Sequence, residues 1–257
     1  MNTNGFVRLV DHMPQTELDH AIVQAARVSY SEGTKTVRTD EGLLRYLLRH
    51  WHTTPFEMVE FKFHIKMPMF VARQHMRHRT ASINEMSGRY SILPEDFFMP
   101  SEYREQSSTN KQGSEGPLTR SAELLPKIQA HSTESFKLYK ELLDAGCSRE
   151  LARCHLPLST YTEFYWKVNL HNLLHYLQLR LEPGAQEEIR WYAQEMLKCI
   201  EPLVPMTVRA FRDYRLNAIQ LSAIEIKCIQ SRTRPENKRE AAEFQRKLEI
   251  MGLDTIL

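Results

Sequence analysis

The chain has 257 residues, of which 42% are apolar and 26% are charged, and its formal net charge is +2. This length is sufficient for one large domain or two small ones. The near balance of charge argues against a whole-protein field that would attract nucleic acid or a membrane. Since no run of about 18 apolar residues occurs, we expect no transmembrane helix.

The N-terminal residues and the cysteines indicate the compartment. The first fifteen residues lack a basic region followed by an apolar run, so we expect no secretory signal. The cysteines form no Cys-x-x-Cys pair, which argues against a zinc knuckle or a thioredoxin-type site. Reduced thiols in the cytoplasm are therefore expected.

The first half of the chain has helical and strand patterns in turn. Residues 16–29 have helical periodicity, with Thr16 as a plausible N-cap. Asp40 is expected to cap a second helix that stops before Pro55. Residues 58–67 alternate apolar and polar side chains with period two, which predicts a half-buried strand. Pro68 can open a short helix over 69–78.

The second half is mostly helical in pattern. Residues 101–120 are polar and contain Gly and Pro, so they are expected to form a surface loop. A helix is predicted over 121–145 and is ended by Gly146. Ser148 is expected to cap a shorter helix that stops at Pro157. Between them and the C-terminal helices, residues 160–168 are rich in aromatic and β-branched side chains and favour a strand.

Three further helical stretches complete the chain, at 170–181, at 184–203 and in a charged tail that begins near residue 206. The tail has the composition of a solvated helix. The order of elements indicates a mixed α/β (α+β) domain with few strands, because no regular strand–helix–strand alternation is seen.

The segment Arg77–Tyr90, RHRTASINEMSGRY, has neither a helical nor a strand stripe, and we expect it to be a functional loop. Its three arginines carry planar donor groups suited to phosphate. Ser87 and Gly88 can add a hydroxyl and exposed backbone N–H groups, and Asn84 and Glu85 can bind a base or a sugar. Together they suit a nucleotide.

Two other interpretations of this segment remain open from the residues alone. It could be a solvated basic loop with an internal ion pair to Glu85. It could also be an RNA-binding patch, although such a patch is expected to contain exposed aromatic side chains and a basic surround. Tyr90 is nearby, but the rest of the chain is nearly balanced in charge.

The same segment resembles the signature of the flavin-dependent thymidylate synthases, the ThyX family, which is RHRxxSxNExSxRY. Further blocks that resemble the family are HTTPFE, VARQHMRHR, LARCHLPLSTYTEFYWKVN and LHYLQLR, in the family's order from about Phe6 to about Arg215. The resemblance implies a single domain with a small, largely antiparallel sheet flanked by several helices. It places a catalytic domain at 1–215, and the charged pattern of residues 216–257 predicts a helical C-terminal extension outside the resemblance.

The resemblance also implies a reaction and an assembly. dUMP is methylated to dTMP with 5,10-methylenetetrahydrofolate as the one-carbon donor, reduced FAD as the hydride donor and NADPH as the reductant. Family members are usually homotetramers with active sites where subunits meet. The absence of a G-x-G-x-x-G turn from the sequence argues against a Rossmann-type flavin site.

Site residues are carried over by position. Flavin contacts correspond to Thr54, Arg77, His78, Arg79, Glu85, Asn169, His171 and His175. Contacts with dUMP correspond to Gln74, His75, Met76, Arg77, Glu85, Met86, Ser87, Gly88, Arg89, Arg153 and Arg180. His52 corresponds to a histidine near the flavin and folate end of the pocket.

The resemblance gives Arg180 the most specific role. In the family, the arginine at this position meets the uracil ring and favours ionisation at N3, because a fixed cation stabilises the conjugate base of a nitrogen acid. Ionised uracil is more electron-rich at C5. The alternative is an arginine near a helix C-terminus that interacts with the helix dipole.

Other candidates also have plainer interpretations. His171 and His175 lie four residues apart, but no H-E-x-x-H pattern or third ligand is evident, so no metal is expected. Many family members have an arginine at the position of His171. Ser87 lacks an identified base–orienter pair, so we interpret it as a binding residue. Thr54 could serve a turn, and Arg153 could face solvent.

Two alternatives to a thymidylate synthase are considered. One is a flavin-binding oxidoreductase that keeps the fold and lacks methyl transfer, and the other is an RNA-binding module. The main hypothesis predicts a cytoplasmic enzyme with no nucleic-acid or membrane partner.

Overall fold

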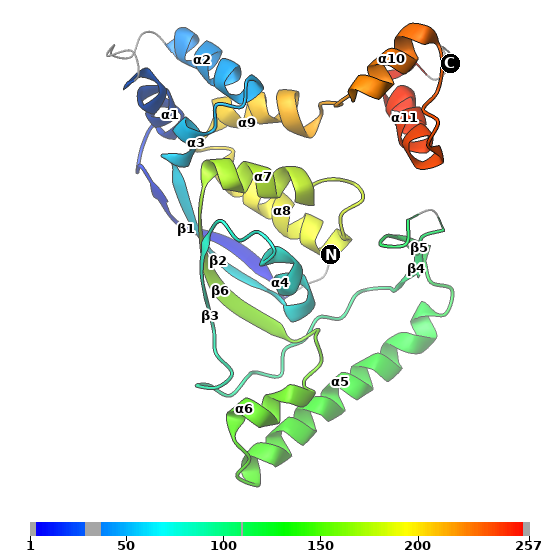
Figure 1. The fold of residues 1–257 in the computed structure, drawn as a ribbon. Coiled ribbons are helices and arrows are strands. Elements are labelled where there is room, and N and C mark those ends of the chain that lie inside the picture. The colour runs from blue at the N-terminus through cyan, green and yellow to red at the C-terminus, as the bar shows by residue number, and fades with distance from the viewer. Residues whose placement is uncertain (1–3, 29–36, 109, 254–257) are drawn as a thin grey trace. The chain divides into compact units, whose positions relative to one another are not determined.

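The computed structural model describes residues 4–28, 37–108 and 110–253. A four-stranded sheet organises the first part of the chain (Figure 1), with the order β1-β2-β6-β3. Its strands are β1 Phe6–Met13, β2 Glu60–Pro68, β6 Tyr161–Asn169 and β3 Ser82–Glu85. All three neighbouring pairs are antiparallel, which confirms the mixed α/β fold with a small antiparallel sheet.

The predicted strands are β2 and β6, and both are confirmed. They pair from Glu60 opposite Asn169 to Pro68 opposite Tyr161. The apolar residues that alternate along β2 are fully buried, whereas the polar ones between them are only partly covered. Three helices lie over the buried face (Figure 1), namely α4 Met69–His75, α7 Leu170–Arg180 and α8 Glu187–Ile200.

Two strands of this sheet were not expected. The pattern of β1 is irregular because its register shifts between Leu9 and Asp11, so no period of two runs through it. β3 lies inside the segment 77–90, which we expected to be a loop, and all four of its residues are exposed. Backbone pairing of Ser82–Glu85 with β6, from Lys167 to Phe164, forms this edge strand without an apolar stripe.

The N-terminal helices form where predicted, but their caps differ. α1 spans Leu18–Arg27, and its N-cap position is Glu17 in the left-handed conformation, so Thr16 is not the cap. Residue 29 of the predicted helix lies outside the described residues. α2 spans Val37–Arg49, which places Asp40 inside the first turn. The Asp40 carboxylate is buried and pairs with Arg27 at 2.8 Å instead of capping the helix.

Two short helices complete this group, α3 Thr54–Glu57 and α9 Pro205–Phe211, and α9 contacts both α1 and α2. The Asp19 carboxylate on α1 accepts hydrogen bonds from the N–H groups of Met206 and Thr207 and from the Thr207 hydroxyl. A side chain from α1 therefore satisfies the first N–H groups of α9.

The middle of the chain contains a hairpin and a long helix. Residues 101–120, expected to be a loop, form the hairpin β4 Arg104–Gln106 and β5 Ser114–Pro117, whose register also shifts. α5 spans Ser121–Asp144 and ends before Gly146, where φ is +85°, as predicted. Ser148 occupies the N-cap position of α6 Arg149–Ala152 but makes no capping hydrogen bond through its side chain. The 3-10 turn η2, Arg153–His155, follows.

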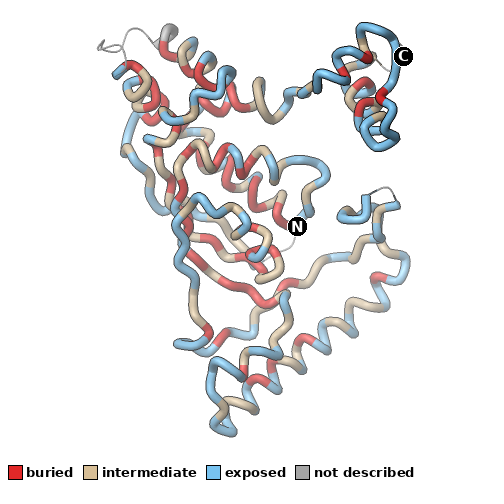
Figure 2. The backbone as a smooth tube through the Cα atoms, viewed as in Figure 1, coloured by how far each residue is buried: buried red, intermediate tan, exposed pale blue. Residues whose placement is uncertain are grey.

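The chain divides into two compact units, Met1–Phe211 and Arg212–Leu257. The second unit begins with a π-helical turn, η3 Arg212–Leu216, and contains α10 Ala223–Ser231 and α11 Lys238–Met251. These two helices share a small core of Cys228, Phe244 and Leu248. Figure 2 shows buried residues in this core and, separately, buried residues along the central strands and the helices of the first unit. Within the described residues, no helix is long and apolar enough to cross a membrane.

Candidate active site

Two cavities in the first unit contain most of the predicted site residues. We name the first the cationic cavity; it measures about 390 Å³ and is lined by Arg77, His78, Arg79, Thr80, Trp166, Val168, Asn172, His175, Leu179 and Arg180. We name the second the Arg153 cavity; it measures about 270 Å³ and is lined by Met69, Ala72, Arg73, Met76, Glu85, Met86, Gly88, Leu93, Arg153, Leu158 and Thr162.

Local structure explains why these residues meet in the cationic cavity. Arg77–Thr80 follow the C-terminal end of α4, and the β6 residues Trp166 and Val168 point to the same face of the sheet because they are two apart. Asn172, His175 and Leu179 recur at helical spacing on α7 and line the remaining wall. The lining of this cavity contains three arginines and no carboxylate among the residues that the structure describes.

Arg180 is held at this cavity by two acceptors. Its Nε donates to His78 Nε2 at 3.1 Å, and its Nη2 donates to the backbone carbonyl of Gln74 at 3.4 Å. Because a guanidinium group can only donate, His78 Nε2 must accept, and the ring is the neutral form with its proton on Nδ1. Burial, together with the charges of Arg180 and His175, lowers the pKa of His78 to about 4.

His75 lies behind this pair in the core. Its side chain is fully buried, and its Nδ1 shares a hydrogen bond of 3.0 Å with the Tyr176 hydroxyl. Burial is the main cause that lowers the pKa of His75 to about 3, and burial also raises the pKa of Tyr176. A predicted dUMP contact at position 75 would therefore involve the backbone at the C-terminal end of α4 rather than the imidazole.

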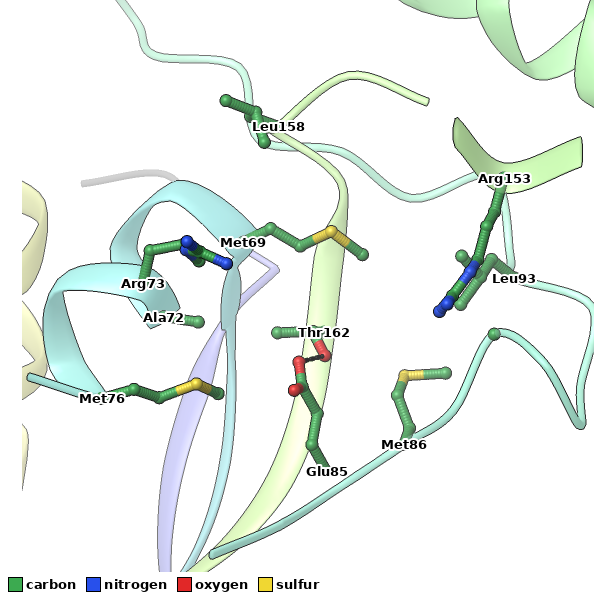
Figure 3. Close-up of a pocket in the computed structure, with 11 residues that line it drawn as sticks. Met69, Ala72, Arg73, Met76, Glu85, Met86, Leu93, Arg153, Leu158 and Thr162 are labelled. Atoms are coloured by element: carbon green, nitrogen blue, oxygen red, sulfur yellow. Dashed lines mark hydrogen bonds between the residues drawn. The ribbon is translucent and has the colours of Figure 1, made fainter. Parts of the chain in front are cut away.

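The second half of the segment Arg77–Tyr90 contributes Glu85, Met86 and Gly88 to the lining of the Arg153 cavity. Glu85 Oε1 accepts a hydrogen bond of 2.6 Å from the hydroxyl of Thr162 on β6. Figure 3 shows Arg73 and Arg153 on opposite sides of the space that contains Glu85 and Met86. Two guanidinium groups and a carboxylate around an apolar floor can bind a ligand that carries both an anion and hydrogen-bonding groups.

Gly88 is buried in this wall because neighbouring side chains approach its backbone. A Cβ at this position would lie 3.1 Å from Arg153 Cδ and 3.1 Å from Leu93 Cδ1. The Ser87 hydroxyl accepts from the backbone N–H of Arg89 at 3.2 Å, and Arg89 forms an exposed ion pair with Glu150 at 3.4 Å. The Arg89–Glu150 ion pair thus connects the segment to α6.

The other predicted residues line neither cavity. His52 is exposed and its ring stacks with that of Tyr46 at 5.8 Å, and Thr54 is exposed at the start of α3. Asn169 is the N-cap of α7, where its side-chain oxygen accepts from the backbone N–H of Asn172 at 2.9 Å. His171 is half-buried in the first turn of the same helix.

Sequence reasoning missed several cavity residues, chiefly Arg73, Thr162, Trp166 and Asn172. Arg73 stands inside the block VARQHMRHR, so the block itself was the available signal. For Thr162 and Trp166 the signal was the alternation along β6, which places both on the buried face. Within the described residues, no group of three or more His, Cys, Asp or Glu side chains could hold a metal ion.

Comparison with known proteins identifies the family. Residues 8–206 match the family model described as "Thymidylate synthase complementing protein", Thy1. A flavin-dependent thymidylate synthase of Thermus thermophilus is 52% identical over 251 residues, which cover 97% of this chain and 88% of the relative. The one from Dictyostelium discoideum is 48% identical over 269 residues, covering 99% and 88%.

A solved structure is also similar. The UMP/dUMP methylase PolB from Streptomyces cacaoi, bound with 5-Br dUMP, superposes with a TM-score of 0.76 and 32% sequence identity, over 83% of this chain and 97% of that one. The chain therefore shares the fold of this nucleotide methylase, which gives the class of protein. Within that class, the chain belongs to the Thy1 family of flavin-dependent thymidylate synthases.

Proposed function

We propose that this protein is a flavin-dependent thymidylate synthase that converts dUMP to dTMP. The observation that carries the proposal is the placement of Arg180, whose guanidinium is bonded to a neutral histidine in a cavity lined by two further arginines. The names of the relatives in Thermus thermophilus and Dictyostelium discoideum support the same activity.

The proposed reaction is a reductive methylation. C5 of dUMP forms a bond to the methylene carbon of 5,10-methylenetetrahydrofolate, the two bonds from that carbon to the folate nitrogens break, and the C5 proton is lost. FAD supplies the hydride that completes the methyl group, after reduction by NADPH. The products are dTMP, tetrahydrofolate and NADP⁺.

The residues of the cationic cavity fit a phosphate-bearing cofactor. Arg77 and Arg79 offer bidentate donors, and the described lining contributes no negative charge that would repel a diphosphate. Contacts with FAD are proposed for Thr54, Arg77, His78, Arg79, Glu85, Asn169, His171 and His175, with His52 near the flavin and folate end.

The dUMP contacts are proposed at both cavities. Arg153 and the backbone of Gly88 would hold the phosphate, and Arg180 would meet the uracil ring. A fixed guanidinium beside N3 lowers the cost of ionising the uracil, which raises the electron density at C5. The remaining dUMP contacts would come from Gln74, His75, Met76, Arg77, Glu85, Met86, Ser87 and Arg89.

The division between cavities supports an assembly. The two cavities share none of their described lining residues, and Arg153 and Arg180 lie in different ones. Along β6, Thr162 lines one and Trp166 lines the other, a separation of about 13 Å for four residues of strand. We therefore propose a homotetramer in which one copy supplies the phosphate-binding residues and another supplies Arg180 to the same dUMP.

Complementation tests the function directly. The wild-type chain is expected to rescue a thymidine-requiring cell that lacks its own synthase, and Arg180→Ala is expected to fail although it is expressed equally well. Purified wild-type protein should show a flavin absorption spectrum. A well-expressed wild-type chain that does not rescue would refute the proposed function. Rescue by Arg180→Ala would remove only the role of Arg180.

A further inference from the structure

Tyr176 lies at the centre of a buried aromatic cluster behind the cationic cavity. Its ring contacts the rings of His75, His78 and Trp166, with centroids 4.9, 4.8 and 5.3 Å away. Tyr176 is fully buried, and its hydroxyl shares the hydrogen bond of 3.0 Å with His75 Nδ1. Since His75 Nε2 is buried without a hydrogen-bond partner among the described residues, this single bond fixes the orientation of the His75 ring.

The same tyrosine stands next to the two residues that meet at the cavity. Tyr176 precedes Arg180 by four residues on α7, so both side chains lie on one face of the helix. Its ring packs against His78 at an interplanar angle of 71°. His78 in turn accepts from Arg180 Nε at 3.1 Å. A continuous chain of contacts thus connects the His75–Tyr176 hydrogen bond to the Arg180 guanidinium.

We propose that Tyr176, anchored by His75, is a positioning residue that holds His78 as a neutral acceptor and thereby aims Arg180 at the uracil ring. This inference rests on the proposed function, because the uracil contact of Arg180 belongs to it. Using Nε as the donor to His78 leaves Nη1 of Arg180 free of the protein contacts described above and available to the ligand. Tyr176 itself does not touch the substrate.

The surroundings of His78 explain why it stays neutral. The titratable and charged groups that face it are Arg180, His175 and Tyr176 of α7, His75 of α4, and Arg77 and Arg79 beside it. β6 contributes the uncharged Trp166 and Val168. A protonated His78 could not accept from Arg180 and would place a second positive charge next to it.

Four variants test the proposal on the FAD-loaded full chain. Tyr176→Phe keeps the ring and removes the anchoring hydroxyl, and Tyr176→Leu removes the ring. His78→Gln keeps an acceptor for Arg180, whereas His78→Leu removes it. Tyr192→Phe is the matched control, because it also removes a buried tyrosine hydroxyl, one that lies on α8 against Gly5. Steady-state kinetics with dUMP are measured from pH 5 to pH 9.

The expected results separate positioning from general stability. His78→Leu should lower kcat/KM for dUMP by about 100-fold, since misplacement of a catalytic group by about 1 Å costs that much, and His78→Gln should recover most of it. Tyr176→Phe should lower kcat/KM by about threefold and Tyr176→Leu by about tenfold. In Tyr176→Leu, solvent reaches His78, so the acid limb of the pH profile should move to higher pH, while the profile of Tyr192→Phe should match the wild type.

A readout independent of turnover accompanies the kinetics. Long-range ¹⁵N correlation spectra of the wild type should contain a histidine with a protonated Nδ1 and a bare Nε2 that disappears in His78→Gln. Equal kinetics for His78→Gln and His78→Leu, or an unchanged pH profile in a folded, FAD-binding Tyr176→Leu, would overturn the inference. An inactive wild-type protein would instead overturn the proposed function.

Discussion

The hydrogen bond between Thr162 and Glu85 allows a sharp test of the Arg153 cavity. Thr162→Val replaces a buried hydroxyl, only 1% exposed, with a methyl group of nearly the same shape. The Glu85 carboxylate then loses its 2.6 Å donor. Holding a glutamate side chain in one rotamer costs about 1.5 kcal/mol, a cost that ligand binding must then meet. Since about 1.4 kcal/mol is a factor of ten, we expect dUMP affinity to fall about tenfold.

Calorimetric titration of dUMP into the FAD-loaded protein measures this change. The matched control is Thr160→Val, because the Thr160 hydroxyl is equally buried and donates to the carbonyl of Pro157 at 2.7 Å, away from the carboxylate. Both variants should lose about 1 kcal/mol of stability, and only Thr162→Val should bind dUMP more weakly. Affinity within twofold of the wild type in Thr162→Val would refute the reasoning.

Three further predictions concern packing, capping and pH. Gly88→Ala should raise the KM for dUMP about tenfold, because the new Cβ would lie only 3.1 Å from Arg153 Cδ and would displace that side chain. Gly42→Ala is the control and should leave KM unchanged, because no atom lies within 4 Å of its Cβ. Equal KM values in the two variants would contradict this prediction. Asp19→Ala should lower the free energy of unfolding by about 2 kcal/mol or more, since three donors at the start of α9 lose their acceptor. A melting temperature equal to that of the wild type would contradict this prediction. The His75 imidazole takes up a proton near pH 6.5 in the unfolded chain but only near pH 3 in the folded protein. The free energy of unfolding should therefore fall as the pH drops below 6.5, by roughly 2 kcal/mol at pH 5 from this residue. A melting temperature that is the same at pH 7 and pH 5 would refute this prediction.

Elements with one buried face could be predicted from the sequence. The strand β2 alternates because Phe61, Phe63 and Ile65 face the helices while their neighbours do not. The edge strand β3 could not be predicted in this way, since all of its residues are exposed and only backbone pairing with β6 defines it. The predicted N-cap role of Asp40 was wrong because of a tertiary contact: Arg27 from another helix pairs with the Asp40 carboxylate.

The candidate site shows the same limit. The motif identified Arg77, His78 and Glu85 by type, but the partner of each depends on the fold. His78 and Arg180 are 102 residues apart in sequence and 3.1 Å apart in space. The donor to Glu85 is Thr162, and this pairing can be predicted only when the register of β3 against β6, with Glu85 opposite Phe164, is known.

The register of β3 also changes how the signature segment itself is understood. Arg77–Thr80 line the cationic cavity, whereas Glu85, Met86 and Gly88 line the Arg153 cavity, and β3, which ends at Glu85, connects the two groups. A strand rises about 3.3 Å per residue, so the edge strand sets a fixed spacing between the two groups of donors. The exposed, unpatterned residues of β3 therefore have a structural role, because their backbone pairing with β6 keeps two binding surfaces of one motif at a constant separation.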